Sequence, residues 1–363
     1  MQARKPNEVL RRGWTTGAYA AATSGAAFKA LLTGKFESSI KIHLPKGQNP
    51  EFTLCESKIG NNWAKAGAIK DAGDDPDITH GCKIISKVRI GRKNSGIIFK
   101  SGEGVGTVTL RGLPLKIGEP AINPKPRELI SNVINQIADE FNAPTDLIIT
   151  ISIPNGEILA KKTMNGRLGI VGGLSILGTT GIVIPYSCAS WVNSIHRGID
   201  VARAANLNHI AAATGSTSET AVKNMLNLPE QALIDMGDFA GGMLKYLRKK
   251  PIPFLTVAGG FSKITKLAQG NLDLHSSRSQ LDMKKLSKMV DELGGSKKLV
   301  KSSHKANTGL EVLEMCEINQ INIGNRVAKR AREVILASLA GEITVDVLIF
   351  NHKGKLVGRT NEH

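Results

Sequence analysis

The stretch His209-Ile210-Ala211-Ala212-Ala213-Thr214-Gly215-Ser216-Thr217-Ser218-Glu219 indicates the fold of the C-terminal half of the chain. A short, mostly apolar run is followed by a loop of small hydroxyl-bearing residues, and Glu219 to Leu226 then suits a helix. This order is typical of a buried strand that leads into a helix, the repeating unit of a parallel α/β sheet. We therefore expect a Rossmann-like α/β domain in this half.

The same order recurs downstream. The other elements expected here are a strand at Ile234 before Gly237-Asp238, a helix to Leu247, a strand over Pro253 to Ala258, a helix from Gly259-Gly260 to about Ala268, a helix over Asn325 to Leu339 and a last strand over Thr344 to Phe350. Ligands in open α/β sheets bind at the carboxyl ends of the strands, which makes Thr214, Gly215, Ser216 and Asp238 candidate ligand contacts. Ordinary capped turns would explain the same residues. Residues 271–308 are polar and Lys/Ser-rich, which predicts an exposed helix with mobile flanks.

The first half of the chain has a different pattern. A threonine before small residues and a glycine after them predict one helix from Thr15-Thr16-Gly17 to Leu32, followed by Thr33-Gly34. The other elements expected are strands at Ile40 to Leu44, Phe52 to Lys58, Trp63 to Lys70, Lys83 to Ile90, Gly96 to Lys100, Val105 to Leu110 and Asp146 to Ile153, and a helix from Pro126-Arg127 to about Phe141. We expect an α+β domain with a mostly antiparallel sheet over residues 1–187 and the α/β domain over 188–363.

Composition narrows the class of protein. The chain has 363 residues, of which 41% are hydrophobic and 22% charged, as in a folded globular protein large enough for two domains. No apolar run approaches the roughly 20 residues of a membrane span, and the N-terminus lacks a secretory signal, so we expect a cytoplasmic protein without membrane contact. The four cysteines form no CxxC pair, which predicts reduced, mostly buried thiols. His80 and Cys82 have no second pair to complete a zinc site, so we expect no bound metal.

The net charge of +17 suits nucleic acid, an anionic membrane surface or a polyanionic small molecule. The basic residues are scattered, and the chain has neither a long basic tail nor a basic motif interleaved with aromatic residues. We therefore favour a small-molecule partner over a nucleic acid. A solvated basic surface would explain much of the same charge.

The run from Gly166 to Gly181, GRLGIVGGLSILGTTG, has six glycines in sixteen residues among aliphatic side chains. So many glycines destabilise helix and strand interiors, and the aliphatic residues are atypical of a flexible linker. We expect a buried backbone surface that lines a cleft between the two halves, with a purely structural crossover as the alternative.

Two polar motifs lie near the N-terminus. In Arg11-Arg12-Gly13-Trp14-Thr15-Thr16-Gly17 two cations precede a helix start, whose free N–H groups suit a carboxylate or phosphate. An ordinary capped helix is the alternative. In Ala72-Gly73-Asp74-Asp75-Pro76-Asp77-Ile78-Thr79-His80-Gly81, three carboxylates and a histidine are groups that bind a hard cation or supply a general base. An ordinary Asp-rich turn is the alternative.

Other motifs exclude common chemistries. The glycines of Gly102-Glu103-Gly104-Val105-Gly106-Thr107 lead into a strand and not into a helix, which argues against a dinucleotide-binding fingerprint. They would allow a ligand to approach the backbone closely, and a tight hairpin explains them as well. The chain has no GxxxxGK[ST], HExxH or GxSxG pattern, so P-loop, zinc-protease and α/β-hydrolase chemistry lack support.

In this order, the motifs resemble the CbiD family of cobalt-precorrin-5B (C1)-methyltransferases of anaerobic cobalamin biosynthesis. The segments that carry the resemblance are Arg12 to Gly17, Gly73 to Asp77, Gly102 to Gly106, Gly118 to Asn123, Gly166 to Gly181, Thr214 to Glu219 and Met236 to Phe239. Tyr19 departs from the family pattern, in which we expect a cysteine, and residues 271–308 look less typical of the family.

The resemblance implies an enzyme that uses S-adenosylmethionine as methyl donor and a ring-contracted tetrapyrrole, carrying its own cobalt, as acceptor. The candidate contacts to the acceptor are Arg12, Thr15, Thr16, Arg127 and Arg167, because its acetate and propionate groups favour cations and hydroxyls. The candidate contacts to the donor are Gly172, Gly173, Thr179, Thr180, Thr214, Gly215, Ser216 and Asp238. Asp75, Asp77 and His80 are the candidates for the catalytic groups.

The residues leave two rival functions open. One is another transferase for anionic substrates on the same two domains, and the other is a basic RNA- or DNA-binding protein. The sequence also leaves open whether the chain forms a homo-oligomer.

Overall fold

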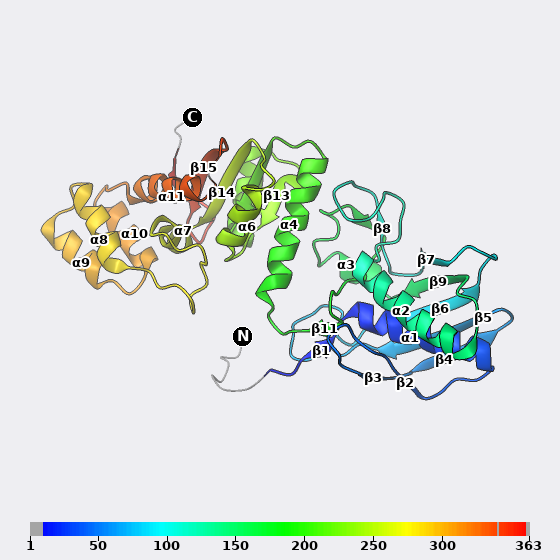
Figure 1. Ribbon diagram of the computed structural model, residues 1–363. Helices are drawn as coiled ribbons and strands as arrows, with labels where there is room; N and C mark the ends of the chain where they lie inside the picture. The colour runs from blue at the N-terminus through cyan, green and yellow to red at the C-terminus, as the bar shows by residue number, and fades with distance from the viewer. Residues whose placement is uncertain (1–9, 340, 361–363) are drawn as a thin grey trace. The chain divides into compact units, whose positions relative to one another are not determined.

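The computed structural model describes residues 10–339 and 341–360. The chain divides into two compact units, the first ending at Cys188 and the second beginning at Ala189 (Figure 1). Both units combine helices with strands, so the fold is of the mixed α/β kind. Among the described residues, no helix combines the length and the apolar character that a membrane crossing needs.

The first unit is built on a five-stranded sheet with the strand order β4-β5-β6-β9-β7. These strands are β4 (Glu56–Gly60), β5 (Trp63–Ile69), β6 (Lys83–Ile90), β7 (Ile97–Ser101) and β9 (Leu147–Ser152). Neighbouring strands are antiparallel except for β7, which runs parallel to β9. A second, two-stranded sheet pairs β2 (Ser39–Lys41) with β3 (Glu51–Thr53).

Helix α1 (Thr16–Thr33) is the core of the first unit. It packs on β5 and β6 on one side and on α2 (Pro124–Phe141) on the other, as Figure 1 shows. A helix buried on most sides needs small side chains, and the alanines of α1 meet Ala64, Ala66 and Ala68 of β5, which are 0% exposed. The predicted caps are confirmed, because Thr15 accepts a hydrogen bond from Ala18 N and Gly34 ends the helix at φ +76°.

Two strand predictions in the first unit are wrong. The stretch Phe52 to Lys58 is not one strand, because Leu54 N donates to Ser38 O and Cys55 N donates to Gly67 O. The chain therefore changes partner between β3 and β4. The strand expected over Val105 to Leu110 is only β8 (Thr107–Val108), which pairs with β10 (Ile170–Val171) of the glycine run.

The second unit is built on a sheet with the strand order β13-β12-β14-β15-β16. The strands are β12 (His209–Ala213), β13 (Leu233–Asp235), β14 (Phe254–Gly260), β15 (Thr344–Phe350) and β16 (Leu356–Arg359). The first four are parallel, and β16 is antiparallel to β15. The prediction that β15 is the last strand is therefore wrong, because the chain turns back after Phe350.

Helices cover both faces of this sheet. Val222 of α5 (Ser216–Leu226) packs on one face with Ala211 and Ala258. Helices on the other face contribute to a larger core; they are α4 (Cys188–Ala204), α6 (Ala240–Leu247), α7 (Phe261–Ala268) and α11 (Ile323–Leu339). From β12 the chain goes to β13 on one side and later to β14 on the other. The carboxyl ends of β12 and β14 therefore form a topological switch point, where ligands bind in open α/β sheets.

The expectation of one exposed helix with mobile flanks in residues 271–308 is wrong. This stretch contains α8 (Met283–Glu292) and α9 (Lys297–Lys305), and α10 (Gly309–Ile318) follows. Leu286, Val290 and Leu299 are buried in the core of the second unit. The helices are amphipathic, so their lysines dominate the composition while their apolar residues pack inward.

Candidate active site

In the first unit the structure brings together the two polar motifs of the N-terminal half. Arg12 forms an isolated antiparallel bridge with Gly73, Trp14 N donates to Asp71 O, and Asp74 N donates to Arg11 O. The approach is so close that a Cβ on Gly73, at φ +69°, would lie 2.2 Å from the carbonyl oxygen of Arg11. Only glycine allows this contact, so the motif fixes the acidic loop beside the start of α1.

A buried lysine organises the acidic loop. Lys70 is 1% exposed, and its ammonium group donates to the Asp77 carboxylate and, at 2.5 Å, to Thr79 Oγ1. Thr79 Oγ1 lies 3.5 Å from the hydroxyl of Thr16, at the first turn of α1. Burial would raise the pKa of Asp77, but the charge of Lys70 and the hydrogen bonds from Lys70 and Thr79 outweigh it and lower that pKa. Asp77 is therefore held as a carboxylate.

Sequence reasoning missed Lys70, because a lysine at the end of a predicted strand is usually solvated. The signal available was its place directly before the acidic loop. Asp71 was missed as well: it pairs with Arg11, and the hydrogen bond from Arg11 is the main cause that lowers the pKa of Asp71 to about 2.

The three residues expected to be catalytic lie in the same loop. Asp75 Oδ1 accepts a hydrogen bond of 2.7 Å from Tyr186 N, and Asp77 is paired with Lys70 as described. His80 is exposed, its Nδ1 accepts from Ala72 N at 3.1 Å, and it lies 3.8 Å from Asp71 Oδ1. Because Nδ1 accepts a hydrogen bond, Nε2 is the nitrogen that can donate to a ligand.

The three arginines expected to bind the acceptor differ in their surroundings. Arg12 is exposed, and within the described residues its guanidinium makes no hydrogen bond or ion pair. Arg127 instead donates to the Ile122 and Pro120 carbonyls and pairs with Glu119 at 3.1 Å. Arg167 is half-buried at the start of the glycine run. Arg12 is thus an unpaired cation next to the acidic loop, whereas Arg127 holds its own loop.

The two threonines expected to bind the acceptor are both buried. Thr15 caps α1, and Thr16 faces Thr79. Since both hydroxyls lie against the protein, they shape the start of the helix.

The glycine run packs tightly against two other segments of the first unit. A Cβ on Gly173 would lie 2.3 Å from the backbone of Gly104, and one on Gly178 would lie 2.4 Å from Thr15 Oγ1. The remaining candidate residues of the run are less enclosed: Gly172 and Thr179 are exposed, and Thr180 Oγ1 accepts from Ile182 N at 3.4 Å. The backbone of the run is therefore part of the core, and its tips reach the surface.

In the second unit the loops that follow three parallel strands converge on Lys263. This lysine of α7 donates to Thr214 O at 2.9 Å and lies 2.9 Å from Asp238 Oδ1. Thr214 follows β12, Asp238 follows β13, and α7 follows β14. Gly215 and Ser216 begin α5 without a side-chain cap. Sequence reasoning included Lys263 at the end of the third loop, Ala258 to Lys263, but did not name it as a ligand contact.

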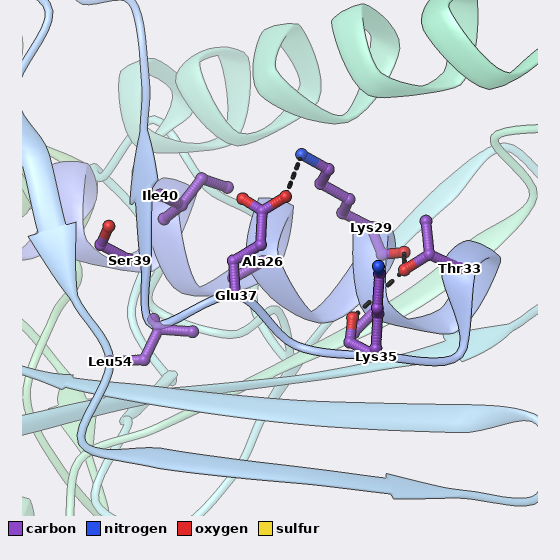
Figure 2. Close-up of a pocket in the computed structure, with 9 residues that line it drawn as sticks. Ala26, Lys29, Thr33, Lys35, Glu37, Ser39, Ile40 and Leu54 are labelled. Carbon is purple, nitrogen blue, oxygen red and sulfur yellow. Dashed lines mark hydrogen bonds and ion pairs between the residues drawn. The ribbon is translucent and has the colours of Figure 1, made fainter.

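One pocket of the first unit lies at the C-terminal end of α1, whereas the acidic loop lies at the N-terminal end of this helix. Figure 2 shows its lining, in which Lys29 pairs with Glu37 and the Thr33 hydroxyl donates to the carbonyls of Lys29 and Lys35. Its charged groups Lys29 and Glu37 pair with each other, so we do not assign it a role in the chemistry.

The described residues contain no cluster of three or more His, Cys, Asp or Glu side chains that could hold a metal ion. None of the four cysteines forms a disulfide bond, and Cys316 is buried. Cys55 and Cys188 are exposed, so the expectation that the thiols are mostly buried is wrong.

Fold and site together define a mixed α/β protein with a group of candidate ligand contacts in each of its two units. The CbiD family model matches residues 3–185, and the model of the CbiD C-terminal domain matches residues 273–361. This chain belongs to the CbiD family. The second match includes most of residues 271–308, so the view that this stretch is less typical of the family is wrong.

Similar proteins span nearly the whole chain. A protein of Brucella anthropi is 52% identical over 96% of this chain and 95% of its own length, and one of Paramagnetospirillum magneticum is 53% identical over 97% and 98%. Both are named cobalt-precorrin-5B C(1)-methyltransferase. The crystal structure of the cobalamin biosynthesis protein CbiD from Archaeoglobus fulgidus is 28% identical, with a TM-score of 0.40 over 76% of this chain and 86% of that chain.

Proposed function

We propose that this protein is a cobalt-precorrin-5B C(1)-methyltransferase. It transfers a methyl group from S-adenosylmethionine to C1 of cobalt-precorrin-5B and forms cobalt-precorrin-6A in anaerobic cobalamin biosynthesis. The observation that carries the proposal is the match, at about 52% identity over nearly the full length, to relatives with this name. The corrinoid brings its own cobalt, so the protein needs no metal site.

The chemistry asks for positioning more than for strong acids or bases. S-Adenosylmethionine supplies a methyl group on a cationic sulfur, and its transfer to a ring carbon is an in-line displacement. The residues of this chain must hold the donor and acceptor in line and exclude water. The two groups of candidate contacts, one in each unit, support a division of this work between acceptor and donor.

We assign the acceptor to the acidic-loop group of the first unit. Arg12 binds a peripheral carboxylate of the corrinoid through a charge-assisted hydrogen bond, since it has no partner among the described residues. Asp77 acts through Lys70 as a positioning residue for the loop. Asp75 and His80 face the acceptor, where His80 Nε2 donates a hydrogen bond.

We propose that residues 188–363 form a Rossmann-like domain that binds the methyl donor and that residues 1–187 form an α+β domain that binds the acceptor. The fit of the methyl donor is supported by Asp238 Oδ1, a buried oxygen that is ion-paired with Lys263 but accepts no hydrogen bond among the described residues. Thr214, Gly215 and Ser216 complete this group at the switch point. The exposed tips of the glycine run, Gly172 and Thr179, remain candidates for the reacting end of the donor.

The test is incubation of the purified protein with cobalt-precorrin-5B and S-adenosylmethionine carrying a labelled methyl group. We expect one labelled methyl group in the corrinoid, detected by mass spectrometry, and its position at C1 by NMR. A parallel incubation with the metal-free ring shows whether cobalt is required. Absence of transfer by a protein with a cooperative thermal transition would contradict the proposed function.

A further inference from the structure

The ion pair of Lys263 and Asp238 has an unusual hydrogen-bond state. Lys263 Nζ lies 2.9 Å from Asp238 Oδ1, yet this oxygen is buried and has no hydrogen-bond partner among the described residues. The hydrogen bond that Lys263 Nζ donates goes to the carbonyl oxygen of Thr214. The Asp238 oxygen is thus ion-paired but accepts no hydrogen bond from the part of the chain that the structure describes, so it can still accept one from a donor group of a ligand.

A second observation lies at the same switch point. Thr214 is only 5% exposed, and none of the hydrogen bonds of the described residues uses its hydroxyl. Its side chain faces the end of β14, because a Cβ on Gly259 would lie 2.8 Å from Thr214 Oγ1. The first N–H groups of α5 lie next to it and have no side-chain cap. A cation, a carboxylate, a hydroxyl and free backbone N–H groups thus lie around the carboxyl ends of β12 and β14.

We propose that Lys263 and Asp238 bind the amino-acid end of the methyl donor, Lys263 through the carboxylate and Asp238 through the ammonium group. The inference rests on the proposed function and adds Lys263 as a residue that determines specificity. A simple anion such as phosphate would be repelled by the carboxylate of Asp238, and a simple cation would be repelled by the ammonium group of Lys263. A zwitterion, with both charges on one carbon, matches the short separation of the pair.

The experiment compares ligands with and without the amino-acid end by isothermal titration calorimetry. S-Adenosylhomocysteine keeps this end and is not consumed, whereas 5′-methylthioadenosine has the same nucleoside and lacks it. We expect Lys263→Met and Asp238→Asn each to weaken S-adenosylhomocysteine binding by about 10- to 100-fold, the range of one charge-assisted hydrogen bond. The affinity for 5′-methylthioadenosine is expected to stay unchanged.

The matched control is Lys245→Met, the same change at an exposed lysine of α6. It is expected to bind both ligands as the wild type does. Lys263→Arg keeps the charge and is expected to restore part of the lost affinity, which a purely structural role would not predict. Circular dichroism and thermal melting establish that each variant is folded.

The outcomes separate the two proposals. If the wild type binds S-adenosylhomocysteine and Lys263→Met binds it equally well, the inference is overturned and the proposed function stands. If Lys263→Met loses affinity for both ligands to the same extent, Lys263 supports the pocket and does not read the amino-acid end. If the folded wild type binds neither ligand at millimolar concentration, both the donor assignment and the inference fail.

Discussion

Lys70 and Asp77 form an ion pair in which the side chain of the lysine is 1% exposed and that of the aspartate 24%. The two side chains differ in exposure: the ammonium group finds its hydrogen-bond partners within the protein, whereas the carboxylate is still in contact with solvent. Thr79 binds both members, since its hydroxyl lies within hydrogen-bond distance of each. The acidic loop is therefore fixed from inside the first unit, and its outer groups are presented on a rigid backbone.

Removing the buried cation is expected to destabilise the protein. Lys70→Met leaves Asp77 partly buried without its counter-charge, which should lower the free energy of unfolding by about 3 kcal/mol, at the low end for buried pairs because water reaches the carboxylate. Urea unfolding measures this. The control is Lys29→Met in the exposed pair with Glu37 (Figure 2), for which less than about 1 kcal/mol is expected. Equal losses in the two variants would contradict the special role of Lys70.

The stability of the protein should fall in acid through the depressed carboxylates. The pKa of Asp77 in the folded state lies below its ordinary value, and that of Asp71 is lowered to about 2. Their stabilising contributions are therefore complete above the unfolded pKa of about 4 and disappear as the pH falls through the folded values. Asp77→Asn should flatten the thermal midpoint against pH between about pH 5 and pH 2. Parallel curves for wild type and variant would rule this out.

The two arginines Arg12 and Arg127 should respond in opposite ways. Arg12→Gln removes a cation that has no partner within the described residues, so we expect an unchanged melting temperature and a KM for the corrinoid raised about 10-fold. Arg127→Gln breaks hydrogen bonds to the Ile122 and Pro120 carbonyls, so we expect a loss of about 1–3 kcal/mol in stability and little change in KM. Steady-state kinetics and thermal melts of both variants test this assignment. A raised KM for Arg127→Gln together with a loss of stability for Arg12→Gln would contradict it.

The glycine run should tolerate a methyl group at one position and reject it at another. A Cβ on Gly173 would lie 2.3 Å from the backbone of Gly104, so Gly173→Ala forces two backbone segments apart. We expect a loss of about 1–3 kcal/mol, as in overpacked cores. Gly166→Ala meets no atom within 4 Å and should change stability by less than about 0.5 kcal/mol. Similar melting temperatures for both variants would contradict the interlocked backbone.

Much of the fold could be predicted because its signals are local. Thr15 and Gly34 mark the ends of α1, and the small-residue loops after β12, β13 and β14 mark a parallel sheet. The predictions failed where the signal was not local. The break between β3 and β4 depends on the hydrogen bonds of Leu54 and Cys55 to separate strands, and composition hid the buried faces of α8 and α9.

The sequence by itself determined most of the helices and strands, the alternation of strands and helices in the second unit, and the motifs that place the chain in its family. Local propensity and hydrophobic period decide such features. Only the tertiary structure decided that Asp77 pairs with Lys70 and that Lys263 joins the loops carrying Thr214 and Asp238. It also decided that, within the part of the chain that the structure describes, the guanidinium of Arg127 has partners and that of Arg12 has none. Ion pairs depend on burial and on contacts between separate elements, which no local pattern encodes.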